Sequence, residues 1–216
     1  MRKLRMYNNP FKGLLITFCG LDGCGKTTMI TRLASDLRRC GGDVMLTRQP
    51  TDAVRHSEIF RNYMDSSEHS AYDYRSMSVL AASDRLQHVR KVISPALDEG
   101  RIVISDRYFY SCLANLRARG YGRDVWIYDI ARHIIRPDVA FFLDIDVPTA
   151  VSRVRARPSE KDRYIDMPLQ YRLRDEYLAI CRRCGGILVP TDVSEDSTYE
   201  FIRNKVEQIM EVRSWN

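Results

Sequence analysis

The stretch Leu14-Leu-Ile-Thr-Phe-Cys-Gly-Leu-Asp-Gly-Cys-Gly-Lys-Thr-Thr28 joins a short apolar run to a glycine-rich turn that opens a helical pattern. Its central part, Gly20-Leu-Asp-Gly-Cys-Gly-Lys-Thr27, matches the spacing G-x-x-x-x-G-K-[ST] in full. Glycines in this spacing let backbone N–H groups converge on phosphate oxygens, and the following helix directs the positive end of its dipole at the same anion. The stretch therefore predicts a phosphate-binding loop between a strand and a helix.

Four further apolar runs have the composition of buried strands, at residues 43–47, 101–105, 139–144 and 187–189. Long stretches with helical spacing separate them. Strands that alternate with helices predict a parallel sheet, because each parallel connection needs a crossover segment that packs on the sheet. The sequence therefore predicts an α/β fold in which helices cover both faces of a five-stranded parallel sheet.

The helical stretches carry recognisable stop signals. The longest runs from about residue 72 to 97, where Pro95 is expected to kink its end and Gly100 to stop it before the next strand. A later helical pattern is interrupted by the polar stretch Arg157-Pro-Ser-Glu-Lys-Asp-Arg163. This interruption predicts an exposed, mobile loop within about residues 153–166, the part of the chain called the lid below.

Length and composition match one domain covering residues 1–216, with 44% hydrophobic content. No apolar run approaches the roughly 20 residues that a membrane helix requires, and the basic extension at residues 1–12 lacks the apolar stretch of a secretory signal. We therefore predict a cytoplasmic protein without membrane contact. The six scattered cysteines are expected to be reduced thiols.

The net charge of +6 indicates anionic ligands. Much of the excess is clustered arginine, which suits a pocket for polyphosphates, and the sequence has no aromatic-rich platform for stacking a polymer of bases. We therefore expect small-molecule nucleotides as partners and no nucleic acid.

Residues in and near the loop have the chemistry that nucleotide binding requires. Lys26 can reach the β- and γ-phosphates as a point charge, and the Thr27 hydroxyl can join the shell of a Mg²⁺ ion. Asp106 ends the apolar run Ile102-Val-Ile-Ser-Asp106 and suits a second group for the metal, so we predict Mg²⁺ as cofactor and ATP as phosphoryl donor. The predicted ATP-binding residues are Gly20, Leu21, Asp22, Gly23, Cys24, Gly25, Lys26, Thr27 and Thr28.

Five segments together resemble the thymidylate kinase family, and they span the chain from about Leu14 to about Asp196. The resemblance implies a P-loop kinase fold with an arginine-bearing lid, and a nucleoside monophosphate kinase that converts dTMP to dTDP. It also implies a homodimer. The segments are Phe18-Cys-Gly-Leu-Asp-Gly-Cys-Gly-Lys-Thr-Thr28, Thr47-Arg-Gln-Pro50, Ala82-Ser-Asp-Arg-Leu-Gln-His88, Asp106-Arg-Tyr108 with Ser111, and Leu143-Asp144 through Arg163.

The resemblance implies a role for each matching residue. Asp22 would hold the sugar hydroxyl of the acceptor, Arg107 would bind the acceptor phosphate, and Arg85 would face the acceptor base. Arg48 would lie beside the acceptor. Tyr164, which follows a lid arginine, would supply part of an aromatic wall.

The source of catalytic positive charge also follows from the resemblance. In one branch of the family an arginine follows the acidic residue of the loop, whereas this chain has Gly23 there. The other branch supplies arginines from the lid, and a guanidinium suits the task because it binds phosphate through two N–H groups and keeps its charge. The lid of this chain carries Arg153, Arg155, Arg157 and Arg163, and the predicted catalytic residues are Lys26, Arg107, Arg155, Arg157 and Arg163.

Departures from the family pattern leave the acceptor open. Ala81 stands four positions before Arg85, where the family has an aromatic residue that stacks on thymine. Asn115 and Leu116 stand where the family has Tyr-Gln. We therefore expect a roomier pocket and keep another nucleoside monophosphate as an alternative acceptor.

Three other classes of protein share part of this pattern. A P-loop switch needs an N-K-x-D motif at a strand end, and the nearest string, Asn204-Lys-Val-Glu207, lies within a helical pattern. A nucleoside kinase would need a general base near a sugar hydroxyl, and no separate acidic residue occupies an obvious position for it. A nucleic-acid-dependent ATPase would bind its polymer in a salt-dependent manner.

Overall fold

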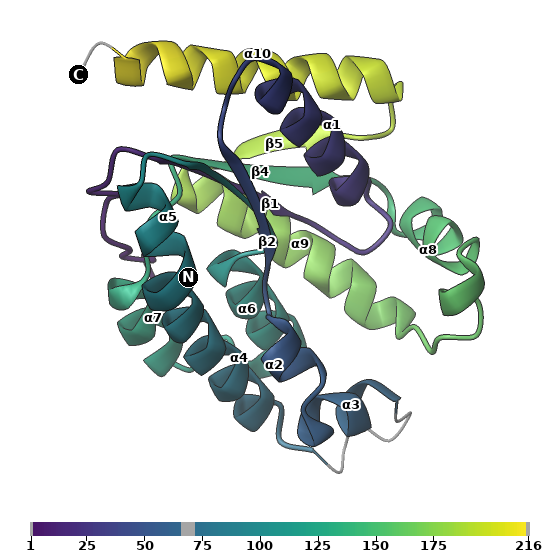
Figure 1. Ribbon diagram of the computed structural model, residues 1–216. Helices are drawn as coiled ribbons and strands as arrows, with labels where there is room; N and C mark the ends of the chain where they lie inside the picture. Colours follow the sequence, from purple (N-terminus) through teal and green to yellow (C-terminus); the bar gives the residue numbers. More distant parts are fainter. Residues whose placement is uncertain (1, 66–71, 215–216) are drawn as a thin grey trace.

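A parallel sheet forms the centre of the computed structural model, which describes residues 2–65 and 72–214 (Figure 1). Neighbouring strands all run parallel, in the order β2-β3-β1-β4-β5. The predicted α/β fold is confirmed, and each predicted strand lies within one residue of an observed one. The strands are β1 (Leu14–Cys19), β2 (Val44–Arg48), β3 (Ile102–Asp106), β4 (Val139–Asp144) and β5 (Ile187–Pro190).

The burial of each strand follows its place in the sheet. Every residue of β1 is buried, and β3 and β4 are buried except for their last aspartates. Strands covered on both faces need apolar side chains on both, which explains why these runs are continuous and do not alternate. Strand β2 lies at an edge and alternates buried with more exposed positions. Aromatic packing joins the central strands, with ring centroids of Phe18 and Phe141 5.2 Å apart.

Helices cover both faces of the sheet, as predicted (Figure 1). On one face α1 packs against β1, β2 and β3, and α10 packs against β4 and β5. On the other face α5 contacts β3, α9 contacts β4 and β5, and α6 packs between α4 and α9. None of the helices in the described ranges is long and apolar enough to span a bilayer. The bounds are α1 (Lys26–Arg39), α4 (Tyr74–His88), α5 (Ser94–Asp98), α6 (Phe109–Leu116), α9 (Met167–Cys184) and α10 (Glu195–Ser214).

The predicted long helix at residues 72–97 consists of three consecutive helical segments. Helix α4 passes into a π-helical turn at Val89–Ile93, and α5 continues to Asp98. Pro95 is the second residue of α5, which directly follows the π-helical turn, so the helix is irregular next to the proline that is expected to kink it. Gly100 has φ +83° and ends the helix, as predicted.

The shorter elements frame the carboxyl edge of the sheet. After β4, helix α8 is followed by the exposed 3₁₀ turn Pro158–Glu160 before α9 starts at Met167. These residues lie where the lid is predicted, and their mobility stays a prediction. The remaining helices are α2 (Asp52–Arg55), α3 (Glu58–Asp65), α7 (Trp126–Ile130) and α8 (Val147–Arg155).

The strand order brings the chemistry-bearing residues to one edge. Strand β1 has β3 on one side and β4 on the other, so the connections that leave its carboxyl end diverge and open a crevice. The glycine-rich loop follows β1, Asp106 ends β3, and the segment before the lid follows β4. The fold therefore predicts a binding site at this edge.

We expect the Phe141→Ala substitution to lower the free energy of unfolding by about 3–5 kcal/mol, because it empties a fully buried ring site between central strands. The matched control is Phe201→Ala on α10, whose ring is 39% exposed and should cost at most about 1 kcal/mol. Urea unfolding monitored by circular dichroism measures both values. Equal losses for the two variants would contradict this account of the core.

Candidate functional site

The glycine-rich loop folds tightly against the strand ends. Gly20 has φ +138°, and a Cβ there would lie 2.4 Å from the Leu143 carbonyl oxygen. Lys26 is the first residue of α1 and only 6% exposed. Its Nζ donates to the Leu21 carbonyl at 2.7 Å and to the Gly20 carbonyl at 3.3 Å. The ammonium group therefore lies across the loop, where a phosphate chain can replace these carbonyls as its partner.

Gly23 shows why this loop carries no arginine after Asp22. Its φ is +85°, and a Cβ would lie 2.1 Å from the Ala150 carbonyl oxygen of α8. A side chain at this position would meet both backbone strain and a fixed carbonyl. Positive charge for the γ-phosphate must therefore come from other segments, as the sequence predicts.

A cluster of one carboxylate and two arginines lies beside the loop. Asp22 pairs with the Arg107 guanidinium, and its Oδ2 is 3.5 Å from Nη1 of Arg163. Arg163 also contacts Glu160 at 2.8 Å. The Arg107 charge, helped by Lys26 and Arg163, holds the pKa of the Asp22 carboxyl well below its usual range although burial opposes this. Asp22 is therefore ionised and acts only as a hydrogen-bond acceptor.

Arg107 is held in a strained backbone conformation. Its φ is +64°, an unusual value for a residue with a side chain. The backbone is fixed by an N–H donated to the Phe18 carbonyl at 2.8 Å and by the Ser105 hydroxyl, which donates to the Arg107 carbonyl at 2.7 Å. Nη1 donates to the Tyr177 hydroxyl at 2.9 Å. Such strain, of order 1–3 kcal/mol, concentrates at functional positions.

A cavity of about 310 Å³ opens beside this cluster, and we call it the main cavity. Its volume falls within the range of small-molecule sites. Asp22, Arg85, Arg107 and Arg163 all border it, so four residues predicted from the sequence face one space. The P-loop, α2, α3, α4, α6, the lid segment and α9 supply its walls.

Two predicted acceptor residues lie elsewhere. Arg48 pairs with Asp52 on the surface and borders a separate cavity at the β2 edge. Tyr164 is 59% exposed and borders a small side cavity next to the main one. Neither borders the main cavity of the described residues. Their contacts with an acceptor stay predictions.

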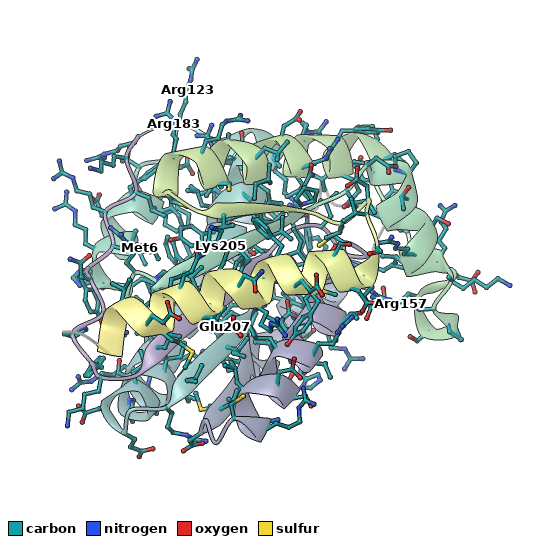
Figure 2. All side chains as sticks on the ribbon, turned by 90° about the horizontal axis from the view of Figure 1, so that it is seen from above. Met6, Arg123, Arg157, Arg183, Lys205 and Glu207 are labelled. Atoms are coloured by element: carbon teal, nitrogen blue, oxygen red, sulfur yellow. The ribbon has the colours of Figure 1, made fainter. Side chains whose placement is uncertain are left out.

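The arginines of the lid segment divide between two spaces. Arg153 and Arg157 border a cavity together with Gly23, Gly25 and Thr28 of the loop, and we call it the lid cavity. Figure 2 shows Arg157 beside the end of α10 from which that helix starts. Arg163 borders the main cavity instead. Arg155 is exposed at the end of α8 and borders neither space, so its catalytic role stays a prediction.

The oxygen atoms at the end of β3 fit a magnesium ion. Oδ1 of Asp106 is buried without a hydrogen-bond partner among the described residues. Thr27 is exposed in the first turn of α1 and borders the same edge cavity as Asp106. The described ranges contain no cluster of three His, Cys, Asp or Glu side chains that could hold a metal. Mg²⁺ usually combines one or two protein oxygens with substrate phosphates and water, and the side chains of Asp106 and Thr27 offer oxygens of this kind.

Several cavity residues escaped the sequence analysis. Arg55 of α2 borders the main cavity, where burial, followed by the nearby Arg48 and Arg107 charges, lowers its pKa. An anion bound here would relieve that repulsion. Phe60, Tyr63 and Tyr74 also border the cavity and supply aromatic surface that Ala81 does not. Arg55 and these aromatics match no motif, so only the three-dimensional packing reveals them.

The string Asn204-Lys-Val-Glu207 lies inside α10, far from either end of that helix. Figure 2 shows Lys205 and Glu207 along its length. A base-reading motif of a switch protein must follow a strand and face the nucleotide, so this string cannot act as one. The helical position of this string is as predicted and gives a P-loop switch no support.

The phosphate loop, the carboxylate at the end of β3 and the arginine-lined cavity define a P-loop nucleotide phosphotransferase. Comparison with known proteins places it more closely. The thymidylate kinase family model matches residues 18–202. A probable thymidylate kinase of Thermococcus kodakarensis is 37% identical over 205 residues, which cover 92% of this chain and 97% of that protein. A thymidylate kinase of Geobacillus sp. is 36% identical over 190 residues, covering 85% and 90%.

The chain therefore belongs to the thymidylate kinase family. Membership makes it an ATP-dependent phosphotransferase. The family resemblance seen in the sequence is thereby confirmed.

We expect Gly23→Ala to destabilise the protein by about 1–3 kcal/mol more than Gly25→Ala does. Both glycines have positive φ, +85° and +93°, so both variants share the backbone strain. Only Gly23 faces a carbonyl oxygen at 2.1 Å, whereas a Cβ at Gly25 meets no atom within 4 Å. Thermal and urea unfolding measure the difference. A larger loss at Gly25 would show that α8 does not close on the loop as described.

Proposed function

We propose that this chain transfers the γ-phosphoryl group of Mg-ATP to a nucleoside monophosphate, with dTMP as the acceptor and dTDP as the product. The observation that carries the proposal is the meeting of Asp22, Arg107 and Arg163 in one cavity directly against the phosphate loop. An acceptor in that cavity would place its own phosphate beside the γ-phosphate of ATP in the loop. The names of the relatives support dTMP as the acceptor.

Phosphoryl transfer needs alignment and charge compensation, and it needs no covalent nucleophile from the protein. A phosphate oxygen of the acceptor attacks the γ-phosphorus, and ADP leaves. Arg107 and Arg55 line the main cavity and would bind the acceptor phosphate. The strained backbone of Arg107 holds its guanidinium against the loop, so alignment is built into the fold.

Charge on the transferring group would be offset from two sides. Lys26 would bind the β- and γ-phosphates from the loop, while Arg157 and Arg163 would approach from the lid segment. Asp106 and Thr27 would hold Mg²⁺, which would supply further positive charge for the phosphates. When acceptor groups bind Arg107 and Arg163, the ion pairs of these arginines with Asp22 would break. The Asp22 carboxylate would then accept a hydrogen bond from a sugar hydroxyl.

The part of the main cavity near Arg85 suits the base of a nucleotide, but its residues do not select one base. Arg85 is 2% exposed, and its Nε has no hydrogen-bond partner in the described residues. A carbonyl oxygen of the base would accept a hydrogen bond from the Arg85 guanidinium after a small shift of that side chain. Aromatic surface comes from Tyr74 and Phe60 and not from residue 81. This changed wall keeps another nucleoside monophosphate as the alternative acceptor.

A nucleoside kinase is the less favoured alternative. Such an enzyme needs a general base whose pKa lies near the working pH. Asp22 is the acidic residue of the loop, and its pKa is held low by Arg107. A carboxylate of this kind is a weak base, which favours a phosphate acceptor that needs no base.

Three statements about the cellular context stay predictions. The family resemblance implies a homodimer, the composition indicates nucleotides and not nucleic acid as partners, and we place the protein in the cytoplasm. A filter-binding assay with single- and double-stranded DNA at moderate salt tests the second of these directly.

A screen of acceptors tests the proposed function. The purified protein is incubated with Mg-ATP and each common ribo- and deoxynucleoside monophosphate, with thymidine as a phosphate-free acceptor, and ADP release is measured. We expect release with dTMP and none above background with thymidine. Release with thymidine alone would establish a nucleoside kinase. Parallel samples contain DNA or RNA in place of these acceptors, and release only there would establish a nucleic-acid-dependent ATPase.

We expect Lys26→Ala to reduce turnover by about a hundredfold or more, because its ammonium group stabilises phosphate charge in the transition state. Nζ contacts only loop carbonyls and the Cys24 sulfur among the described residues, so the melting temperature should hardly change. Coupled-assay kinetics and thermal unfolding measure the two properties. A folded variant that keeps a tenth of wild-type turnover would refute the role assigned to the loop.

We expect the double substitution Arg157→Ala and Arg163→Ala to lower kcat by roughly a thousandfold while raising the KM for ATP far less. These arginines border two different cavities beside the loop and would act on the charge that develops during transfer. Lys161→Ala, an exposed cation of the same segment, serves as the control for lost charge. An unchanged kcat with a raised KM would mean that the two arginines only dock ATP.

A further inference from the structure

Arg119 is fixed in the main cavity by residues of three helices. Its Nε donates to the Tyr63 hydroxyl of α3 at 2.9 Å, and its Nη1 donates to Oδ1 of Asn115 in α6 at 2.8 Å. The guanidinium carbon lies 4.0 Å from the centre of the Tyr74 ring in α4. These contacts fix the orientation of the Arg119 guanidinium, so it would need little ordering to bind a ligand in the cavity.

The position of Arg119 relative to Asp22 indicates what it faces. Both residues border the main cavity and also the small side cavity next to it. They therefore border the same space, at the part of the site where the proposed function puts the sugar of the acceptor. The hydrogen bonds of Arg119 to described residues use Nε and Nη1, which leaves the N–H groups of Nη2 for a ligand.

The two side chains have complementary hydrogen-bonding chemistry. Asp22 is ionised and can only accept, whereas a guanidinium can only donate. A vicinal diol satisfies both, because one hydroxyl donates to the carboxylate and the oxygen of the other accepts from the guanidinium. Ribose carries such a diol at its 2′ and 3′ positions. Deoxyribose presents a methylene group at the 2′ position and would leave the guanidinium without that partner.

Space near Arg119 agrees with an added hydroxyl. Asn115 stands where the family pattern has a tyrosine, and its short side chain borders the cavity. Its amide is occupied on both sides, since Nδ2 donates to the Ser111 carbonyl at 2.9 Å while Oδ1 accepts from Arg119. Asn115 therefore orients the guanidinium and fills less of the cavity than an aromatic ring would.

We infer that Arg119 is a specificity-determining residue that recognises the 2′-hydroxyl of the acceptor sugar, so that the site takes ribonucleoside monophosphates as well as dTMP. This inference rests on the proposed function. For one and the same base, the ribose form is used at least as well as the deoxyribose form. Arg119 distinguishes ribose from deoxyribose, and Asn115 holds the Arg119 guanidinium in place.

The test compares UMP with dUMP, which differ only at the 2′ position. We expect the wild-type ratio of kcat/KM for UMP over dUMP to be one or higher. Arg119→Gln should lower this ratio about tenfold to a hundredfold, the worth of a charge-assisted hydrogen bond. Arg119→Lys keeps a charged donor and should retain part of the ratio. Arg123→Gln is the control, because that exposed side chain projects away from the body of the molecule (Figure 2).

Each other outcome has a defined meaning. If Arg119→Gln lowers kcat/KM for UMP and dUMP equally, Arg119 is a structural clamp and the inference is wrong. A wild-type ratio below about one hundredth would also overturn it, and this measurement needs no variant that must fold. Turnover of dTMP with an unchanged ratio leaves the proposed function intact. Turnover of no monophosphate at all would refute the proposed function itself.

Discussion

The ion pairs of Asp22 with Arg107 and Arg163 are the interactions on which the site depends. They join three segments that are far apart in the sequence: the loop after β1, the turn after β3 and the lid segment after β4. Because the carboxylate keeps both guanidinium groups near the loop, the protein holds concentrated positive charge at an edge of the sheet without an arginine in the loop itself. Gly23 cannot supply that charge, since α8 lies too close.

This constraint links packing to chemistry. The fully buried strand β1 fixes where the loop begins, and the neighbouring strands β3 and β4 fix Arg107 and α8 on either side of it. In the proposed function, binding an acceptor would be an exchange of partners, in which phosphate and sugar groups take over contacts that the side chains make with each other. Side chains already held beside the loop would need little reorganisation, which is the condition for strong electrostatic stabilisation of a transition state.

The sequence predicts the parts of the protein that depend on local pattern. The loop, the strand ends and Asp106 could be placed because a motif or an apolar run marks each one. Residues brought in by packing could not be placed in this way. Arg48 and Arg55 lie close together in the sequence, yet Arg48 pairs with Asp52 on the surface while Arg55 borders the main cavity. Arg119 lies in the π-helical turn Arg117–Tyr121 after α6, and it likewise meets Tyr63 of α3 through a contact between distant parts of the chain that leaves no local mark.

The central claim is that the cavity beside the loop holds a phosphate acceptor in line with ATP. Phosphorus NMR of the products formed from Mg-ATP and dTMP tests it most directly, because the spectrum separates ADP, nucleoside diphosphate and inorganic phosphate. The account predicts equal amounts of ADP and dTDP, with inorganic phosphate at the level of an enzyme-free sample. Inorganic phosphate in amounts equal to ADP, without dTDP, would show that water takes the phosphoryl group and would contradict the account.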